Sequence, residues 1–506
     1  MTQVLTLGLD GAAWHKLDRL MADGRLPNLR ALVDDGARAP LRSVYPPVTC
    51  PAWRCSTAGK NPGKLGVYWW LDLDRETGDL LTPNARSFDT ADVWDYLSEE
   101  GYESAVVNVP MTYPPTPIDG VMISGFGAPF ELDIDDRLTC PPELQERIER
   151  EYDWKVGIDD VMAPEGVEET CDLIESRFEL LFDLLDEGYD YLHLTVFYIN
   201  VLQHKFGDGP ETRRGWELID RYLGELPDDI VKILYSDHGH STIENTFVIN
   251  RYLIDRGYLQ FEERTGDSLT GGLYEALNRV GISPRRVAGV AENVIPDDVF
   301  ERLITSGYPV PTSELAGRVN WEESRALALS QGPLYLNRDL LGDEYESFRE
   351  SLREDLQSLS IDGESPLRAV HRAEDVYTGE YLDAAPDLML VLKEGWEMYG
   401  GVTPSVTERQ ANSWTSGNHL EGMVLLHGPG VESGEFPEQS LLDVMPTVLR
   451  YVGCPVPSDV DGTAMEAAFD GPLPDTGTRE PLAPGEGTSE QYSLFKDRLQ
   501  DLGYLE

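Results

Sequence analysis

The sequence is short of basic residues: 41 Lys and Arg stand against 91 Asp and Glu in 506 residues, a formal net charge of −50. No segment gathers Lys or Arg into a basic face, so we expect no nucleic-acid partner. The acids are spread over segments such as VWDYLSEEGY and FELDIDDRL rather than gathered in a tail. Because salt screens repulsion between exposed charges, this distribution favours halophilic adaptation over a specific acidic interface.

Long apolar runs are missing as well. No stretch approaches the roughly 18 apolar residues of a transmembrane helix, so no membrane span is predicted. Cysteine is scarce, odd in number and without metal-binding spacing, which favours reduced thiols and a cytoplasmic location. The five cysteines are Cys50, Cys55, Cys140, Cys171 and Cys454.

Short apolar runs alternate with amphipathic helical segments. The predicted buried strands are QVLTLGL, SAVVNVP, YDYLHLTVFYI, DIVKILY, PDLMLVLK and EGMVLLHGPG, and the predicted helices include SFDTADVWDYLSEEGY, GVEETCDLIESRFELLFDLLDEG, GWELIDRYLGEL and LLDVMPTVLRYVG. Such alternation predicts an α/β fold with a central, mostly parallel sheet flanked by helices.

Changes of pattern divide the chain into four segments. Residues 1–262 and 326–465 are expected to form the first and second parts of the core. Between them, residues 263–325 carry Gly and Pro punctuation without clear strands, which predicts a small helical cap or insertion. Residues 466–506 are rich in Pro, Gly and acids, which predicts a loose tail with a short C-terminal helix.

Several candidate ligands follow predicted strands. They are Asp10 in LGLDGA, Thr49 in PPVTCPAW, Asn200 and His204 in YINVLQH, Asp237 and His238 in YSDHGH, and His419 in TSGNHLEG. Ligands of such sheets gather at the carboxyl ends of strands, and imidazole and carboxylate suit Zn²⁺, with Mn²⁺ or Fe as alternatives. Each residue taken singly also has an ordinary explanation, such as a plain Asp-Gly turn or a structural histidine.

The order of these motifs resembles that of the type I phosphodiesterase/nucleotide pyrophosphatase family of the alkaline phosphatase superfamily. The motifs include LGLDGA, PPVTCPAWRCSTAGKNPGKLGVY, NVPMTYPP, ISGFGAP, QHKFG, YSDHGH, GNHLEGMVLLHGPG and LLDVMPTVLRYVGCPVPSDVDG, and they span nearly the whole chain. The resemblance implies an alkaline phosphatase-like fold with two divalent metal ions at the edge of the sheet.

The same resemblance assigns roles to these residues. Thr49 would be the nucleophile, held by one ion together with Asp10, Asp237 and His238, and would form a phosphothreonine intermediate. The second ion would be bound by two histidines, and two lysines of the GKNPGK turn would supply positive charge near the phosphate. These four residues are His204, His419, Lys60 and Lys64. The expected substrate is a small-molecule, lipid-linked or sugar-linked phosphoester.

Two positions depart from the family pattern. Asn200 stands where the family has an aspartate that binds the second ion, and an amide oxygen is a weaker ligand than a carboxylate. Trp69 and Trp70 stand where eukaryotic members have a phosphate-binding asparagine. A catalytically weakened member that binds phosphoesters or glycans therefore stays an alternative, as does a phosphomonoesterase-like or sulfatase-like relative. The sulfatase pattern C-x-P-x-R fails, since Cys50 is followed directly by Pro51.

Overall fold

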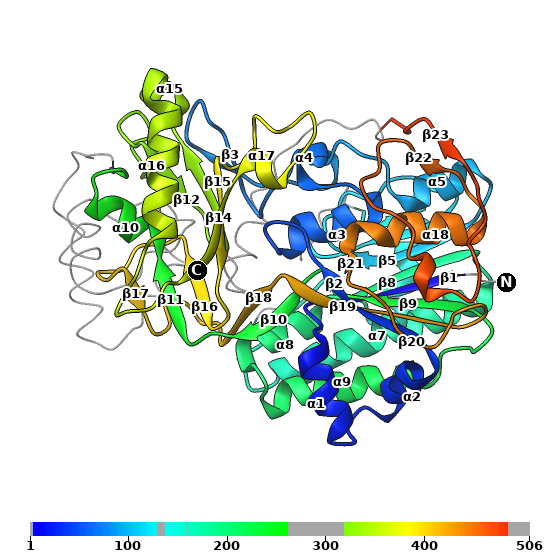
Figure 1. The fold of residues 1–506 in the computed structure, drawn as a ribbon. Coiled ribbons are helices and arrows are strands. Elements are labelled where there is room, and N and C mark those ends of the chain that lie inside the picture. The colour runs from blue at the N-terminus through cyan, green and yellow to red at the C-terminus, as the bar shows by residue number, and fades with distance from the viewer. Residues whose placement is uncertain (1–3, 129–136, 159, 262–317, 484–506) are drawn as a thin grey trace.

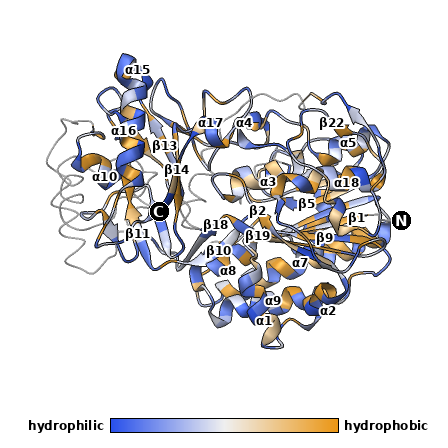
Figure 2. Ribbon diagram, in the orientation of Figure 1, coloured by the Kyte–Doolittle hydropathy of each residue, from blue (hydrophilic) through white to orange (hydrophobic). Residues whose placement is uncertain are grey.

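The computed structural model describes residues 4–128, 137–158, 160–261 and 318–483. These residues form a large lobe around one central sheet and a smaller lobe beside it (Figure 1). The inner strands of the central sheet are mostly hydrophobic, whereas the surrounding helices alternate hydrophobic and hydrophilic residues (Figure 2). The alternation predicted from the sequence therefore corresponds to burial of strands on both faces and of helices on one.

The central sheet has the strand order β20-β2-β19-β9-β1-β8-β5-β6-β7. Its strands are β1 (Val4–Leu9), β2 (Ala37–Arg42), β5 (Ser104–Val109), β6 (Gly120–Ser124), β7 (Thr139–Cys140), β8 (Tyr191–Val196), β9 (Val231–Tyr235), β19 (Glu421–His427) and β20 (Gly434–Glu435). Strands β9, β1, β8, β5 and β6 are parallel, whereas β19 runs antiparallel to both β9 and β2, and β7 runs antiparallel to β6. The α/β class and the mostly parallel sheet are confirmed.

Helices cover both faces of this sheet (Figure 1). One face carries α1 (Trp14–Ala22), α2 (Pro27–Asp35), α7 (Gly166–Glu187), α8 (Tyr198–Phe206) and α9 (Pro210–Leu223). The other face carries α3 (Thr49–Ala58), α5 (Val93–Glu99) and α18 (Val444–Val452). Helix α3 is buried along its whole length, so the position of Thr49 is fixed by packing on every side.

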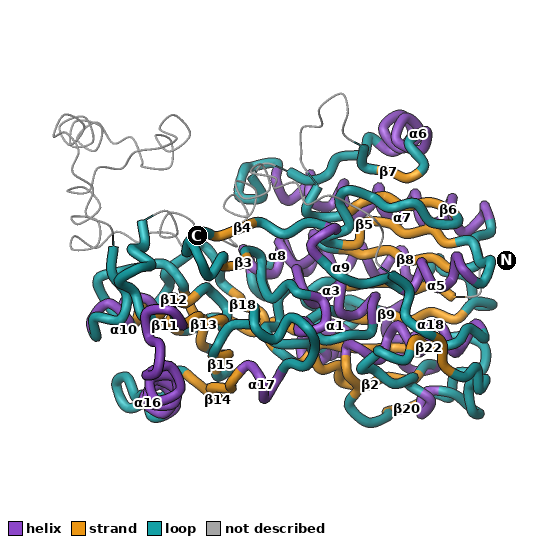
Figure 3. Tube along the Cα trace, turned by 90° about the horizontal axis from the view of Figure 1, so that it is seen from above, coloured by secondary structure: helices purple, strands orange, loops and turns teal. Residues whose placement is uncertain are grey.

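The smaller lobe is built mainly from antiparallel strands. A four-stranded sheet has the order β12 (Ala326–Ala328), β13 (Pro333–Leu336), β15 (Leu388–Leu392) and β14 (Leu367–Arg372). Helix α16 (Tyr345–Gln357) packs on β14, and a three-stranded sheet follows the order β16 (Trp396–Tyr399), β11 (Asn245–Val248) and β17 (Thr407–Glu408), in which β11 and β16 pair in parallel. Seen from above, this lobe lies beside β18 (Ser416–His419), a short strand outside the central sheet (Figure 3).

The smaller lobe changes one expectation about the second part of the core. The run PDLMLVLK is a buried strand, as predicted, but β15 pairs with β13 and β14 and does not join the central sheet. An apolar run indicates burial without specifying which strand will be its partner, so the sequence could not separate the two sheets. Strand β19 does join the central sheet.

The outer segments are described only in part. Nearly all of the cap predicted for residues 263–325, and the expected C-terminal helix, lie outside the described residues. Within the predicted tail, Phe469 and Leu473 are buried against the large lobe. Strand β23 (Thr478–Arg479) pairs with β22 (Val456–Pro457), although most residues of 466–483 are exposed.

Candidate active site

Two buried carboxylates meet at the carboxyl ends of β1 and β9. The strands are adjacent and parallel, and Gly8 pairs with Tyr235. Asp10 and Asp237 each lie two residues beyond that pair, so the register places them side by side. The Gly11 N–H donates to Asp237 Oδ1 at 3.2 Å, which ties the two loops together.

His238 completes this group. Ligand atoms of Asp10, Asp237 and His238 all lie within 4.8 Å of one another, and all three side chains are buried. His238 Nδ1 lies 2.8 Å from the carbonyl oxygen of Gly239, which can only accept, so Nδ1 carries the proton. The lone pair of His238 Nε2 therefore faces the two carboxylates, at 3.7 Å from Asp10 Oδ1 and 3.4 Å from Asp237 Oδ2.

Thr49 places its hydroxyl on the same group. Thr49 is the first residue of α3, and its Oγ1 lies 3.2 Å from His238 Nε2. The helix is held over β1 by Trp53, whose indole N–H donates to Asp10 Oδ2 at 2.8 Å. Gly8 makes this approach possible, because a Cβ at position 8 would lie 2.4 Å from the Trp53 ring.

The electrostatics of the group favour a bound cation. Asp10 Oδ1 and Asp237 Oδ2 are buried and accept no hydrogen bond from any described residue. Burial and the neighbouring Asp237 raise the pKa of Asp10 well above its ordinary value, and burial also raises the pKa of Asp237, against the opposing effect of His238. Two unpaired carboxylate oxygens beside an imidazole nitrogen and a hydroxyl form a donor set that fits a divalent metal ion such as Zn²⁺.

A second set of polar side chains lies on α8, β10 (Gly239–Thr242) and β18. His204 Nδ1 donates to the carbonyl oxygen of Ser416 at 2.7 Å, and the His204 ring stacks on Trp414 with 3.6 Å between centroids. His240 on β10 connects α8 with β18: its Nε2 lies 3.2 Å from His204 Nδ1, and its Nδ1 lies 3.1 Å from Ser416 Oγ. The histidines of this set are therefore held by hydrogen bonds and stacking within the protein.

Three more residues complete this set. Asn200 is buried on α8 against Gly11, where φ is +67° and a Cβ would lie 2.7 Å from the Asn200 side-chain oxygen. His419 ends β18 opposite Gly239, and its Nδ1 accepts the N–H of Glu421 at 3.2 Å. Lys16 of α1 is buried near the histidines. Its positive charge adds to the effect of burial, which is the main cause that lowers the pKa of both His204 and His240.

The structure therefore separates the predicted ligands into two sets. Asp10, Thr49, Asp237 and His238 come together as the resemblance implied. His204 and His419 lie in the second set, and their role as ligands of a second ion stays a prediction. Within the described ranges, Asp10, Asp237 and His238 are the only His, Cys, Asp or Glu group of three or more with ligand atoms this close. His240 is not among the ligands predicted from the sequence, although its place two residues after His238 was a usable signal.

Residues 4–419 match the family model described as type I phosphodiesterase/nucleotide pyrophosphatase. The chain belongs to this family. Its fold also matches solved structures of low sequence identity. Mouse ectonucleotide pyrophosphatase/phosphodiesterase 5 is 12% identical with a TM-score of 0.50, over 88% of this chain and 94% of the mouse chain. The alkaline phosphatase PafA is 13% identical with a TM-score of 0.55, over 92% of this chain and 98% of its own. No curated protein sequence matches the chain significantly.

The lysines of the GKNPGK turn, which were expected to lie near the phosphate, form ion pairs with aspartates. Lys60 Nζ pairs with Asp459 Oδ2 at 2.6 Å, and Lys64 Nζ pairs with Asp461 Oδ1 at 2.5 Å. Arg54, which also lies near Thr49 in sequence, forms a buried ion pair with Asp92 at 2.7 Å. These pairs fasten α3 and the turn that follows it, and the phosphate-binding role of Lys60 and Lys64 stays a prediction.

Two other expectations concern the cysteines and membrane-spanning helices. All five cysteines are free thiols in the structure. None of the helices that the structure describes combines the length and apolar character that a membrane crossing requires.

Proposed function

We propose that this member of the family is a metal-dependent phosphodiesterase or nucleotide pyrophosphatase that works through Thr49. The observation that carries the proposal is the position of Thr49 Oγ1, 3.2 Å from His238 Nε2 and beside two buried carboxylates. A free threonine hydroxyl is a poor nucleophile, and it needs a group that lowers the cost of losing its proton.

The residues of this site divide the work. Asp10, Asp237 and His238 would hold a divalent ion, for which Zn²⁺ suits the donors best and Mn²⁺ or Fe are alternatives. When bound, such an ion stabilises negative charge on phosphoryl oxygens and on the threonine oxygen. Thr49 would attack phosphorus as the bond to the leaving oxygen breaks, which gives a phosphothreonine that water then hydrolyses. Burial of α3 holds Thr49 in one orientation for this in-line attack.

A second ion remains part of the proposal, with lower affinity. Its expected ligands are His204, His419 and Asn200. Asn200 offers a neutral oxygen, and the Nδ1 of His419 already accepts a hydrogen bond. The positive charge of Lys16 near His204 would further oppose a second cation.

The solved relatives support a small phosphoester substrate. One structure of the mouse relative is an inactive threonine-to-alanine variant in complex with AMP. By analogy, we propose a small-molecule phosphoester for this chain, whether free or linked to a lipid or a sugar, and a cytoplasmic location consistent with its free thiols. A phosphoester-binding protein without turnover is the second candidate, and Asn200 is the observation that favours it.

The test compares Thr49→Ala and Thr49→Ser with the unmodified protein. Release of 4-nitrophenol from bis(4-nitrophenyl) phosphate would be measured with Zn²⁺, with Mn²⁺ and after chelation. We expect the alanine variant to lose about 10³-fold or more of kcat, and the serine variant to keep measurable turnover because it keeps a hydroxyl. Full activity in Thr49→Ala would refute the mechanism. No turnover by the unmodified protein with any metal, together with binding of AMP, would favour the non-catalytic candidate.

A further inference from the structure

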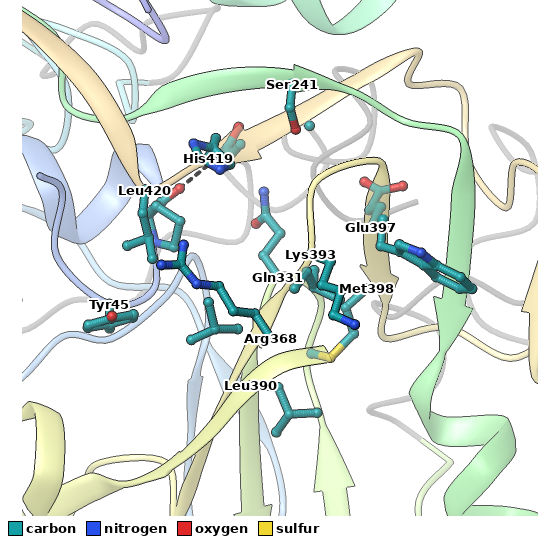
Figure 4. A pocket seen from close by; sticks show the side chains of 16 residues that line it. Tyr45, Ser241, Gln331, Arg368, Leu390, Lys393, Glu397, Met398, His419 and Leu420 are labelled. Carbon is teal, nitrogen blue, oxygen red and sulfur yellow. Dashed lines mark hydrogen bonds between the residues drawn. The ribbon is translucent and has the colours of Figure 1, made fainter. Parts of the chain in front are cut away.

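A pocket lies between the two lobes, next to the candidate active site (Figure 4). The large lobe contributes Tyr45, Pro47 and the end of β18, and the smaller lobe contributes β14, β15 and the turn into β16. The pocket is partly open to solvent.

The wall of this interlobe pocket is continuous with the site around Thr49. Pro47, which lines it, lies two residues before Thr49, and its carbonyl oxygen accepts a hydrogen bond from Asn418 Nδ2 at 2.9 Å. His419, another lining residue, pairs across the strands with Gly239, the residue directly after His238. A substrate with its phosphorus at Thr49 could therefore extend into the pocket.

Two cations, Arg368 on β14 and Lys393 after β15, line the pocket. Within the described part of the chain neither forms an ion pair with a carboxylate, whereas Lys60 and Lys64 do. In Figure 4 the Arg368 side chain extends toward Leu420 and His419, the end of the pocket nearest the site. The one acidic lining residue, Glu397, is buried and accepts a hydrogen bond from Asn412 Nδ2 at 3.1 Å.

The remaining lining combines apolar and aromatic residues with the polar Ser241, Gln331, Asn418 and His419. Leu390, Leu392 and Met398 form part of the surface contributed by the smaller lobe, and Tyr45 and Trp396 present aromatic rings. A ligand that fits this lining has an apolar or planar body and an anionic end. Guanidinium and ammonium groups bind carboxylate and phosphate well, the guanidinium through paired hydrogen bonds.

We propose that Arg368 and Lys393 form a specificity site for an additional anionic group, a carboxylate or a second phosphate, on the organic part of the substrate. The inference rests on the proposed hydrolysis at Thr49, since that reaction places the phosphorus next to the pocket. It assigns the selection of substrates to the smaller lobe and the chemistry to the large lobe.

The test uses three matched 4-nitrophenyl phosphodiesters, whose second ester group is propyl, 3-carboxypropyl or 3-phosphonooxypropyl. Consumption of each is followed by chromatography. We expect the unmodified protein to prefer at least one anionic ester over the propyl ester by about tenfold or more in kcat/KM, which corresponds to about 1.4 kcal/mol. The double variant Arg368→Met/Lys393→Met should lose this preference, while its kcat/KM for the propyl ester stays within about twofold. Comparison of the carboxylate with the phosphate arm shows which anion the site takes.

The matched control is Arg409→Met/Lys155→Met, which removes the same two types of charge outside the pocket and should keep the preference. A missing preference in the unmodified protein, or one that survives in Arg368→Met/Lys393→Met, would overturn the inference. Calorimetric binding of the three esters to Thr49→Ala separates the two proposals. If the unmodified protein hydrolyses none of them but Thr49→Ala discriminates among them through Arg368 and Lys393, the pocket assignment holds and the hydrolase assignment fails.

Discussion

The two halves of the candidate site both contain ligand-type residues but differ in charge and spacing. Around Thr49, Asp10 and Asp237 each leave a buried oxygen without a hydrogen bond. In the other half, His204 and His240 are tied to Ser416 and to each other. The first half brings two carboxylates and an imidazole within 4.8 Å of one another, whereas the second half offers imidazole and amide groups beside the positive charge of Lys16. The difference shows that the presence of ligand-type residues does not by itself make a metal site; their charge and spacing also decide it.

The largest expected effect comes from removing charge in the first half. Asp237→Asn keeps the shape of the side chain but lowers the affinity for a divalent ion, so we expect loss of the bound metal and about a 10³-fold or greater fall in kcat/KM. Metal content by mass spectrometry and turnover of bis(4-nitrophenyl) phosphate would be measured together. The matched change in the second half, His240→Gln, should keep the first ion and stay within about tenfold of the unmodified rate. Equal loss of metal in both variants would erase the distinction between the halves.

A smaller effect is expected from converting the second half into a metal site. Asn200→Asp supplies the carboxylate that the family pattern has at this position. We expect the metal content, measured at one low concentration of free Zn²⁺, to rise from about one ion toward two per chain. The reason is that a charged oxygen binds a cation better than a neutral one. Asn200→Ala is the control, and it should stay at one. A content that does not change in Asn200→Asp would mean that the surrounding hydrogen bonds, and not the missing charge, exclude the ion.

The smallest effect is expected at Lys16, which pairs with Asp208 Oδ1 at 2.8 Å. Lys16→Met and Asp208→Asn both break this pair, but only Lys16→Met removes positive charge beside His204 and His240. We expect Lys16→Met to tighten binding of a second Zn²⁺ by about three- to tenfold, in line with about 1 kcal/mol of repulsion. Titration of the single-metal protein would measure this. A gain of the same size in Asp208→Asn would attribute the effect to the broken pair and not to the charge.

The sequence predicted the parts of the molecule that depend on local pattern. The strands that end at Asp10 and Asp237 were visible as apolar runs closed by Asp-Gly and Asp-His, and the parallel sheet brings such strand ends together. The strands that pair with β15 were not predictable, because an apolar run indicates burial and does not specify which strands lie next to it. The ion pairs of Lys60 and Lys64 could not be predicted for a related reason. Their partners, Asp459 and Asp461, lie about 400 residues away in the sequence, among many other acidic residues. The stacking of His204 on Trp414 likewise depends on contacts across the chain.

The pairing of Lys60 and Lys64 with Asp459 and Asp461 also bears on how the protein is made. The N–H of Asp461 donates to the Gly59 carbonyl at 2.9 Å, so the segment that fastens the end of α3 is synthesised about 400 residues after the helix itself. When the last candidate ligand, His419, has been synthesised, Asp459 and Asp461 have not. The nascent chain therefore contains α3 and Thr49 without the contacts of Asp459 and Asp461 until about forty more residues have been added.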